Sequence, residues 1–207
     1  PPPPPPPTAP PPPPPHPSTP SSAASDVYKR QPVSGTGLQA ADATLVVMAS
    51  GSKEAFEATS AVFEVIGRTT YYLGPFPNGS IMKFIANLLV SVHTLAAAEA
   101  HTLGIAAEMD PQLVQRVIAD GVGSSAMFEI RGPMMVADTY VPPSGRLDII
   151  KKDAEIIQAY AASVGVPTPL LDTAVPTYQA ASQSGLGSLD AAAVCRHLEQ
   201  TGGVERS

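Results

Sequence analysis

The sequence predicts a mainly helical fold, in which the end of an α/β domain precedes an all-α domain. A strand–helix–strand pattern occupies residues 32–73, and only helical patterns follow it. The chain starts with a proline-rich stretch that holds 15 of its 25 prolines. We therefore expect a disordered tail over 1–31, the last part of a doubly wound sheet over 32–73, a helical domain over 74–199 and a flexible tail over 200–207.

The first 31 residues have the composition of a segment that stays outside the fold. Residues 1–20 are nearly all proline, which is typical of polyproline II or disorder. The run Ser21–Gln31 resembles the translation of a transposase adapter used in shotgun sequencing libraries. We interpret 1–31 as a non-native extension, with the true sequence before Pro32 lost. A ligand for SH3 or WW domains is the functional alternative.

The α/β pattern is short but has the signals of each element. Thr44–Ala49 is a β-branched apolar run that predicts a buried strand. Ser52 or Ser50 can cap a helix that runs to about Ile66, where Gly67 ends it. Thr69–Leu73 has the composition of a second strand.

Helical patterns fill the rest of the chain after the turn-rich junction Gly74–Gly79. The first helix, Ile81 to about Gly104, is roughly 35 Å long. It carries two histidines and three other polar residues, so we predict a buried helix and not a membrane span. The further helices are expected at 110–119, 147–164, 170–182 and 189–198.

Composition excludes several function classes. The formal net charge is −6 and no Lys/Arg-rich run exists, so nucleic acid and anionic membranes are poor candidate partners. Cys195 is the single cysteine, which we interpret as a small buried hydrophobe in a reducing compartment, the cytoplasm. His93 and His101 are eight residues apart, a spacing that does not predict a metal site.

Lys83 and Asn87 are the most informative polar pair. They are four residues apart, so on a helix they share one face. Burial lowers the pKa of a lysine toward neutrality and makes it usable as an acid or base, and an asparagine beside it can hold a hydroxyl or a carboxylate. From the residues alone, a lysine whose stem packs at a helix start, with an incidental asparagine, is the simpler interpretation.

A series of short motifs changes that interpretation. They are Pro32-Val33-Ser34-Gly35, Ala40, Thr44-Leu45, Met48, Gly79, Lys83, Asn87, Glu99, Lys152-Asp153, and Pro167 with Pro169-Leu170. In this order they resemble the β-hydroxyacid dehydrogenases, the 3-hydroxyisobutyrate dehydrogenase family, whose helical domain is similar to that of 6-phosphogluconate dehydrogenase. The resemblance implies a remnant of a Rossmann-type NAD(P)-binding domain over 32–73, and an all-α substrate and dimerisation domain over 74–199.

The resemblance also implies a role for each polar residue of the site. Lys83 is then the catalytic lysine, which takes the proton of the substrate hydroxyl as the hydride leaves for the nicotinamide. Asn87 orients the same oxygen, and Asp153 is a supporting active-site carboxylate. Without the resemblance, Lys151-Lys152-Asp153 would be a solvated helix face.

Two further parts of the site follow from the same resemblance. Ser34 and Gly35 correspond to the residues that bind the substrate carboxylate, and Lys152 to a lysine that contacts the cofactor, NAD or NADP. Members of the family commonly carry an aromatic residue where this chain has Gly145. The shape of the substrate pocket therefore stays open.

The expected function is that of a fragment. No Gly-x-Gly-x-x-Gly motif follows a strand, so the phosphate-binding half of the cofactor site is missing. We expect part of an NAD(P)-dependent oxidoreductase that transfers a hydride between nicotinamide and a short β-hydroxyacid or its semialdehyde, inactive by itself and homo-oligomeric. The alternative is a non-catalytic helical module for dimerisation or partner binding. The particular hydroxyacid, and the choice between NAD and NADP, are left open.

Overall fold

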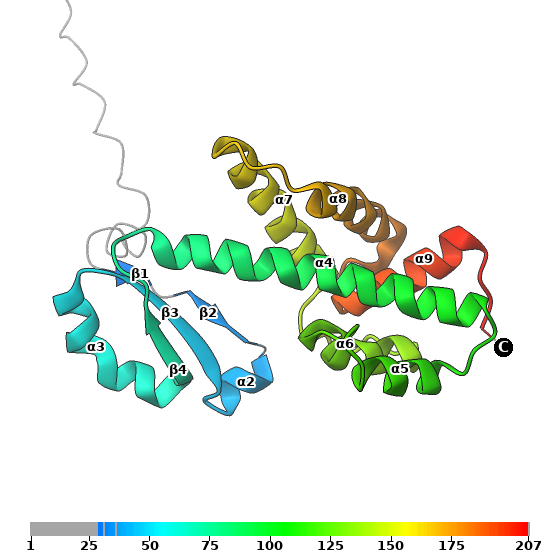
Figure 1. Ribbon diagram of the computed structural model, residues 1–207, viewed down its shortest axis with the longest axis horizontal. Coiled ribbons are helices and arrows are strands. Elements are labelled where there is room, and N and C mark those ends of the chain that lie inside the picture. Colours follow the sequence, from blue (N-terminus) through cyan, green and yellow to red (C-terminus); the bar gives the residue numbers. More distant parts are fainter. Residues whose placement is uncertain (1–28, 31, 36, 207) are drawn as a thin grey trace, which may run out of the picture.

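The computed structural model describes residues 29–30, 32–35 and 37–206, which form a small sheet at one end and a group of helices at the other (Figure 1). The long helix α4 (Asn78–Ala106) begins beside the sheet and runs through the helical part. The predicted mainly α fold, an α/β remnant followed by an all-α part, is confirmed.

The sheet is built around one central strand. Its strands are β1 (Lys29–Arg30), β2 (Val33–Ser34), β3 (Leu45–Gly51) and β4 (Gly67–Tyr72). β3 pairs in parallel with β4 and antiparallel with both β1 and β2. Lys29 lies opposite Gly51 and Ser34 lies opposite Val46, so the two short strands pair with β3 in the same register.

β1 corrects the domain boundary that the sequence predicts at Pro32. The expected tail includes Lys29 and Arg30, yet their backbones pair with the end of β3 at Ser50 and Gly51. Sheet pairing uses backbone groups, so a segment with few apolar side chains can still extend the edge of a sheet. The other residues of the expected tail, 1–28 and Gln31, lie outside the described residues.

The predicted strand–helix–strand unit is confirmed as β3, α3 (Lys53–Ile66) and β4. The hydroxyl of Ser52 accepts a hydrogen bond from the backbone N–H of Ala55 at 3.1 Å, and this caps α3. Phe63 is buried and packs against the apolar side chains of β3. A short helix, α2 (Gly37–Ala41), precedes β3.

The start of α4 lies directly against β3. A Cβ atom at Gly79 would stand 2.6 Å from the carbonyl oxygen of Met48 and 2.9 Å from the hydroxyl of Ser50. Such distances are shorter than van der Waals contact, so the helix can approach the strand this closely only with glycine at this position. Gly79 thereby fixes where Lys83, one turn later, stands relative to the sheet.

By length and composition alone, α4 could cross a membrane. It instead packs against α5 to α9 and carries buried polar residues, Ser91, Thr94 and His101, on its inner face. These contacts describe a core helix, in agreement with the sequence-based prediction.

The remaining helices pack along α4: α7 crosses its first half, and α5, α6 and α9 lie along its second half (Figure 1). They are α5 (Pro111–Ala119), α6 (Ala126–Val136), α7 (Leu147–Ser163), α8 (Pro169–Ala181), a π-helical turn (Ser182–Leu186), a 3-10 turn (Ala191–Ala193) and α9 (Val194–Gly202). The helices predicted from the sequence are confirmed within a few residues. The sequence does not predict α6, because Gly132 and Pro133 lie inside it and interrupt the helical pattern.

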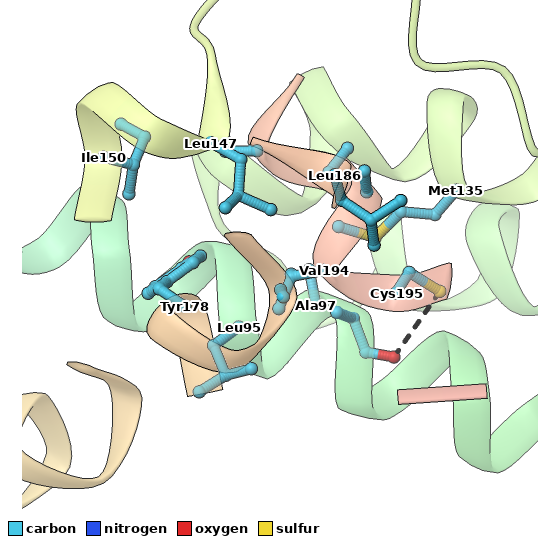
Figure 2. Packing of buried hydrophobic residues seen from close by; sticks show 14 of the residues in the cluster. Leu95, Ala97, Met135, Leu147, Ile150, Tyr178, Leu186, Val194 and Cys195 are labelled. Carbon is cyan, nitrogen blue, oxygen red and sulfur yellow. Dashed lines mark hydrogen bonds between the residues drawn. The ribbon is translucent and has the colours of Figure 1, made fainter. Parts of the chain in front are cut away.

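One apolar cluster joins these helices (Figure 2). Leu95 of α4, Leu147 of α7, Tyr178 of α8 and Val194 of α9 are buried within it. The thiol of Cys195 points from α9 toward α4, 3.9 Å from the carbonyl oxygen of Ala98. The interpretation of Cys195 as a buried hydrophobe is confirmed.

The flexible tail predicted for 200–207 is wrong over most of its length. α9 continues to Gly202, and Gly203 ends it with φ of 64°. Arg206 then pairs with the buried carboxylate of Glu199 at 2.6 Å and donates to the carbonyl oxygen of Met135 at 2.8 Å. A buried carboxylate needs a counter-charge, and this requirement holds the chain end against α6.

Candidate active site

The candidate site lies where the first turns of α4 pass α7. The side-chain amide of Asn87 on α4 donates to Asp153 Oδ2 on α7 at 3.1 Å. This hydrogen bond joins two residues that are 66 positions apart in the sequence. Both side chains are half-buried, so the bond is only partly exposed to competition from water.

Asp153 also forms an ion pair with Lys152. Its Oδ1 lies 2.9 Å from Lys152 Nζ, and the lysine side chain is 57% exposed. An ion pair with so exposed a partner contributes little to stability. The Lys152 ammonium can therefore leave Asp153 for a competing anion at small cost.

Lys83 lies one turn before Asn87 and lines the same small pocket. The pocket has a volume of about 200 Å³. Its lining residues are Lys83, Phe84, Asn87, Asp153, Ile156 and Ile157. Burial lowers the pKa of Lys83 below its usual value, and the charge of Asp153 partly opposes that shift. The site thus holds an amine that releases its proton more easily than a free lysine.

Ser34 and Gly35 are placed differently from this group. They lie at the end of β2, opposite β3, and do not line the pocket of Lys83. Gly35 has φ of 149°, and a Cβ there would stand 2.6 Å from Leu45 Cδ2. The glycine is explained by its backbone angle and the close packing of Leu45. Substrate contact by Ser34 and Gly35 stays a prediction.

Three apolar residues of the pocket are missing from the sequence-based site. Phe84 follows Lys83 directly, while Ile156 and Ile157 lie three and four residues after Asp153. Helical spacing would have placed Ile156 and Ile157 near Asp153. It could not tell a pocket wall from ordinary core packing, because both use the same residue types.

Gly145 lies away from the pocket. A Cβ at Gly145 would stand 3.0 Å from Arg131 Nη2, and the residue is not among those that line the pocket of Lys83. Its difference from the common aromatic residue therefore affects the surroundings of Arg131 and not the walls beside Lys83.

The described residues contain one glycine pattern close to a phosphate-binding turn. Gly35, Gly37 and Ala40 have Gly-x-Gly-x-x-Ala spacing. The strand before them, β2, is antiparallel to β3 and only two residues long, and α2, which begins at Gly37 and includes Ala40, has only five residues. A dinucleotide cradle needs a parallel strand that leads into a helix with several free N–H groups, so this segment does not supply one.

Within the part of the chain that the structure describes, no three His, Cys, Asp or Glu side chains form a cluster that could hold a metal ion. His101 is buried, stacks on Phe128 at 5.1 Å and hydrogen-bonds Gln115 at 2.9 Å. It is a packed histidine.

Two family models match the chain and together span the sheet and the helices. The NAD-binding domain of 6-phosphogluconate dehydrogenase matches residues 27–74. The model described as NAD-binding of NADP-dependent 3-hydroxyisobutyrate dehydrogenase matches residues 78–198, more than half of the chain. The chain belongs to the 3-hydroxyisobutyrate dehydrogenase family. The cofactor of these dehydrogenases is NAD or NADP, as the resemblance implies.

Two members of the family match over nearly the same share of this chain. L-Threonate dehydrogenase of Escherichia coli K12 is 37% identical over 166 residues, which are 80% of this chain and 55% of that protein. Glyoxylate/succinic semialdehyde reductase 1 of Arabidopsis thaliana is 31% identical over 163 residues, 79% of this chain and 56% of that protein. The chain thus spans little more than half the length of these relatives.

A solved structure agrees with the fold. The crystal structure of 3-hydroxyisobutyrate dehydrogenase from Salmonella typhimurium superposes with a TM-score of 0.77 at 35% sequence identity. The match covers 82% of this chain and 59% of that protein. The arrangement of sheet and helices is therefore that of the dehydrogenase family.

Proposed function

We propose that this chain is the catalytic and helical portion of an NAD(P)-dependent oxidoreductase that acts on a short β-hydroxyacid or its semialdehyde. The observation that carries the proposal is the grouping of Lys83, Asn87 and Asp153 around one pocket at the start of α4. The named activities of its relatives, on threonate and succinic semialdehyde among others, support the substrate class.

Lys83 acts as the acid/base. In the oxidation direction the neutral amine accepts the proton of the substrate hydroxyl, and in the reduction direction the ammonium returns it. The lowered pKa of Lys83 suits this exchange, since a proton carrier works best when its pKa lies near the working pH. When bound, the nicotinamide supplies the hydride acceptor or donor.

Asn87 and Asp153 orient the reacting oxygen. Asp153 accepts one N–H of the Asn87 amide, which fixes the amide plane. The second N–H of Asn87 and its carbonyl oxygen then remain for the substrate. Asp153 also keeps a negative charge near Lys83, which limits how far burial lowers the pKa of the lysine.

Lys152 is the residue of this chain that we assign to the cofactor. Its ammonium is exposed and its ion pair with Asp153 is weak, so it is free to meet a phosphate or carboxamide group. The described residues contain no phosphate cradle, as the geometry of β2 and α2 indicates. We therefore expect the 207-residue chain alone to lack micromolar affinity for NADH or NADPH in a fluorescence titration.

The reaction is tested in a chimera. Residues 29–207 are joined to the preceding dinucleotide-binding part of E. coli L-threonate dehydrogenase, and reduction of NAD⁺ and NADP⁺ is followed with L-threonate, 3-hydroxyisobutyrate and L-serine. Turnover of at least one hydroxyacid supports the proposal. A folded chimera that binds NADH but turns over none of them, nor reduces succinic semialdehyde, contradicts it.

The alternative, a helical module for self-association, has its own support. On the exposed face of α4, Met82, Leu89, Ala96 and Leu103 recur every seven residues, and Ile85 lies between the first two. Apolar residues at heptad spacing are typical of helices that pair. We include homo-oligomerisation through α4 in the proposal, and a cytoplasmic location that suits a dehydrogenase with one buried thiol.

A further inference from the structure

α4 carries a line of polar side chains on the face that meets α7 and α8. Lys83, Asn87, Ser91 and Thr94 are spaced four, four and three residues apart, which places them on one side of the helix. Ser91 and Thr94 are buried, with 1% and 0% exposure. The active-site residues are thus the outer end of a polar line that continues two turns into the core.

The inner end of this line is a buried ion pair. Arg131 Nη1 on α6 donates to Thr94 Oγ1 at 2.7 Å, and Arg131 Nε donates to Asp190 Oδ1 at 3.0 Å. Both charged side chains are almost fully buried, at 6% and 0% exposure. Burying two charges is costly unless every polar group is satisfied, so the arrangement calls for a reason beyond filling space.

Asp190 uses its remaining acceptor positions to hold the start of α7. Its Oδ2 accepts from Ser144 N at 2.8 Å, Ser144 Oγ at 2.7 Å and Gly145 N at 3.0 Å. Because Gly145 has no side chain, the guanidinium of Arg131 can lie close to its backbone, where a Cβ would stand 3.0 Å from Arg131 Nη2. The backbone around Asp190 also pairs with that of Arg146, immediately before the first residue of α7.

These contacts form a second cross-link between α4 and α7, parallel to the one in the active site. From Thr94 back to Asn87 is seven residues, and from Arg146 forward to Asp153 is also seven, about 10 Å along each helix. The two helices are therefore fixed at two points, about two helical turns apart. These points are the Thr94–Arg131–Asp190 network and the Asn87–Asp153 hydrogen bond.

We propose that Arg131 and Asp190 are positioning residues, which set the register of α7 against α4 and thereby place Asp153 where it can hold Asn87. Only the effect of this positioning on catalysis rests on the proposed dehydrogenase function. The placement of Asp153 itself is a property of this chain and is measurable without turnover.

The test uses Thr94→Val in the 207-residue chain, which removes the link of α4 to Arg131 but keeps the Arg131–Asp190 ion pair. The matched control is Thr102→Val, the same substitution two turns further along α4, where the hydroxyl lies 3.7 Å from the sulfur of Cys195 on α9. The readout is the side-chain amide resonance of Asn87 in ¹H–¹⁵N spectra, identified by its loss in Asn87→Asp. Asp153→Ala defines the direction in which this resonance moves when the hydrogen bond is lost.

We expect Thr94→Val to move the Asn87 resonance in the direction set by Asp153→Ala, and Thr102→Val to leave it in place at a similar loss of stability. Arg131→Lys, which cannot bridge Thr94 and Asp190 together, should move it at least as far. If Thr94→Val shifts the Asn87 resonance no further than Thr102→Val does, the network is only structural and the proposal is wrong. Should Arg131→Lys fail to fold, Thr94→Val decides alone.

A second readout separates this proposal from the proposed function. In the chimera, Thr94→Val should lower kcat by roughly 10-fold or more, with a smaller change in cofactor KM, because misplacement of the reacting groups slows the chemical step. A chimera without any turnover contradicts the dehydrogenase function, while the Asn87 resonance still decides the positioning role. Unchanged kcat with a shifted resonance would overturn the catalytic consequence.

Discussion

At the scale of single residues, Lys83 is subject to two opposing effects. Burial favours the neutral amine, and Asp153 favours the ammonium. Because the pKa of Lys83 is lowered overall, burial is the stronger effect. The burial of Lys83 on α4 therefore determines the direction of its pKa shift, and the charge of Asp153 reduces the size of that shift.

This balance predicts the effect of Asp153→Asn. Removing the carboxylate removes a charge that raises the pKa of Lys83, so the pKa should fall further. The measurement is an NMR titration of ¹³C-methylated lysines, with the Lys83 signal identified by its absence in Lys83→Arg. Asp148→Asn, on the same helix but paired with Arg146, is the control and should leave the titration unchanged. A higher pKa in Asp153→Asn would contradict the description of the site.

Cys195 gives a second prediction at this scale. Burial raises the pKa of its thiol to about 12, and the hydrogen bond to Glu199 at 3.1 Å acts in the same direction. Almost no thiolate exists at pH 8, so the native chain should not react with a disulfide reagent, although the chain unfolded in guanidinium should react fully. Rapid reaction of the folded protein would show that α9 is not packed as described.

The sequence identified site residues that belong to a specific motif, but it did not identify residues whose role depends on tertiary packing. Lys83, Asn87 and Asp153 could be named from a family resemblance, and the structure brings them together. Arg131 could not, because nothing in its local pattern distinguishes a buried arginine from a surface one. Asp190 caps the turn at Ala191–Ala193, a local role, but its ion pair depends on a residue 59 positions away.

At the scale of elements, the placement of α4 depends on its first turn. Gly79→Ala would drive a Cβ atom against the carbonyl oxygen of Met48, so we expect a loss of about 1–3 kcal/mol in the free energy of unfolding. Chemical denaturation measures it. Gly37→Ala is the control, since a Cβ there meets no atom within 4 Å and alanine favours a helix. Equal stability of the two variants would contradict the close packing of α4 on β3.

Element boundaries were predictable where a cap or a breaker marks them. Ser52 caps α3, and Asp110 caps α5, whose start the sequence predicts at residue 110. α6 was missed because Pro133 lies inside it, and the order of the chain end was missed because it depends on Arg206 meeting a buried Glu199. β1 was missed for a similar reason, since its pairing with β3 uses backbone groups, which the sequence pattern does not show.

At the scale of the whole molecule, the exposed heptad face of α4 predicts self-association. Leu89→Lys places a charge in the centre of that face and should convert an oligomer to a monomer, because a buried unpaired charge opposes helix pairing. Light scattering coupled to size exclusion at tens of micromolar measures the mass. Leu113→Lys, on the exposed face of α5, is the control and should leave the mass unchanged. A monomeric parent chain would contradict association through α4.

The central claim is that Lys83 exchanges a proton with the substrate oxygen. The most direct test compares the chimera with its Lys83→Arg variant in steady-state kinetics across pH, on whichever hydroxyacid the parent chimera turns over. Arginine keeps a positive charge but cannot be deprotonated at working pH. We predict that Lys83→Arg lowers kcat on the order of 10²–10⁴-fold, with a smaller change in cofactor affinity, and removes the pH dependence that the lysine gives the parent. Near-parental kcat with the same pH dependence would contradict the claim, because Lys83 would then serve only as a fixed charge.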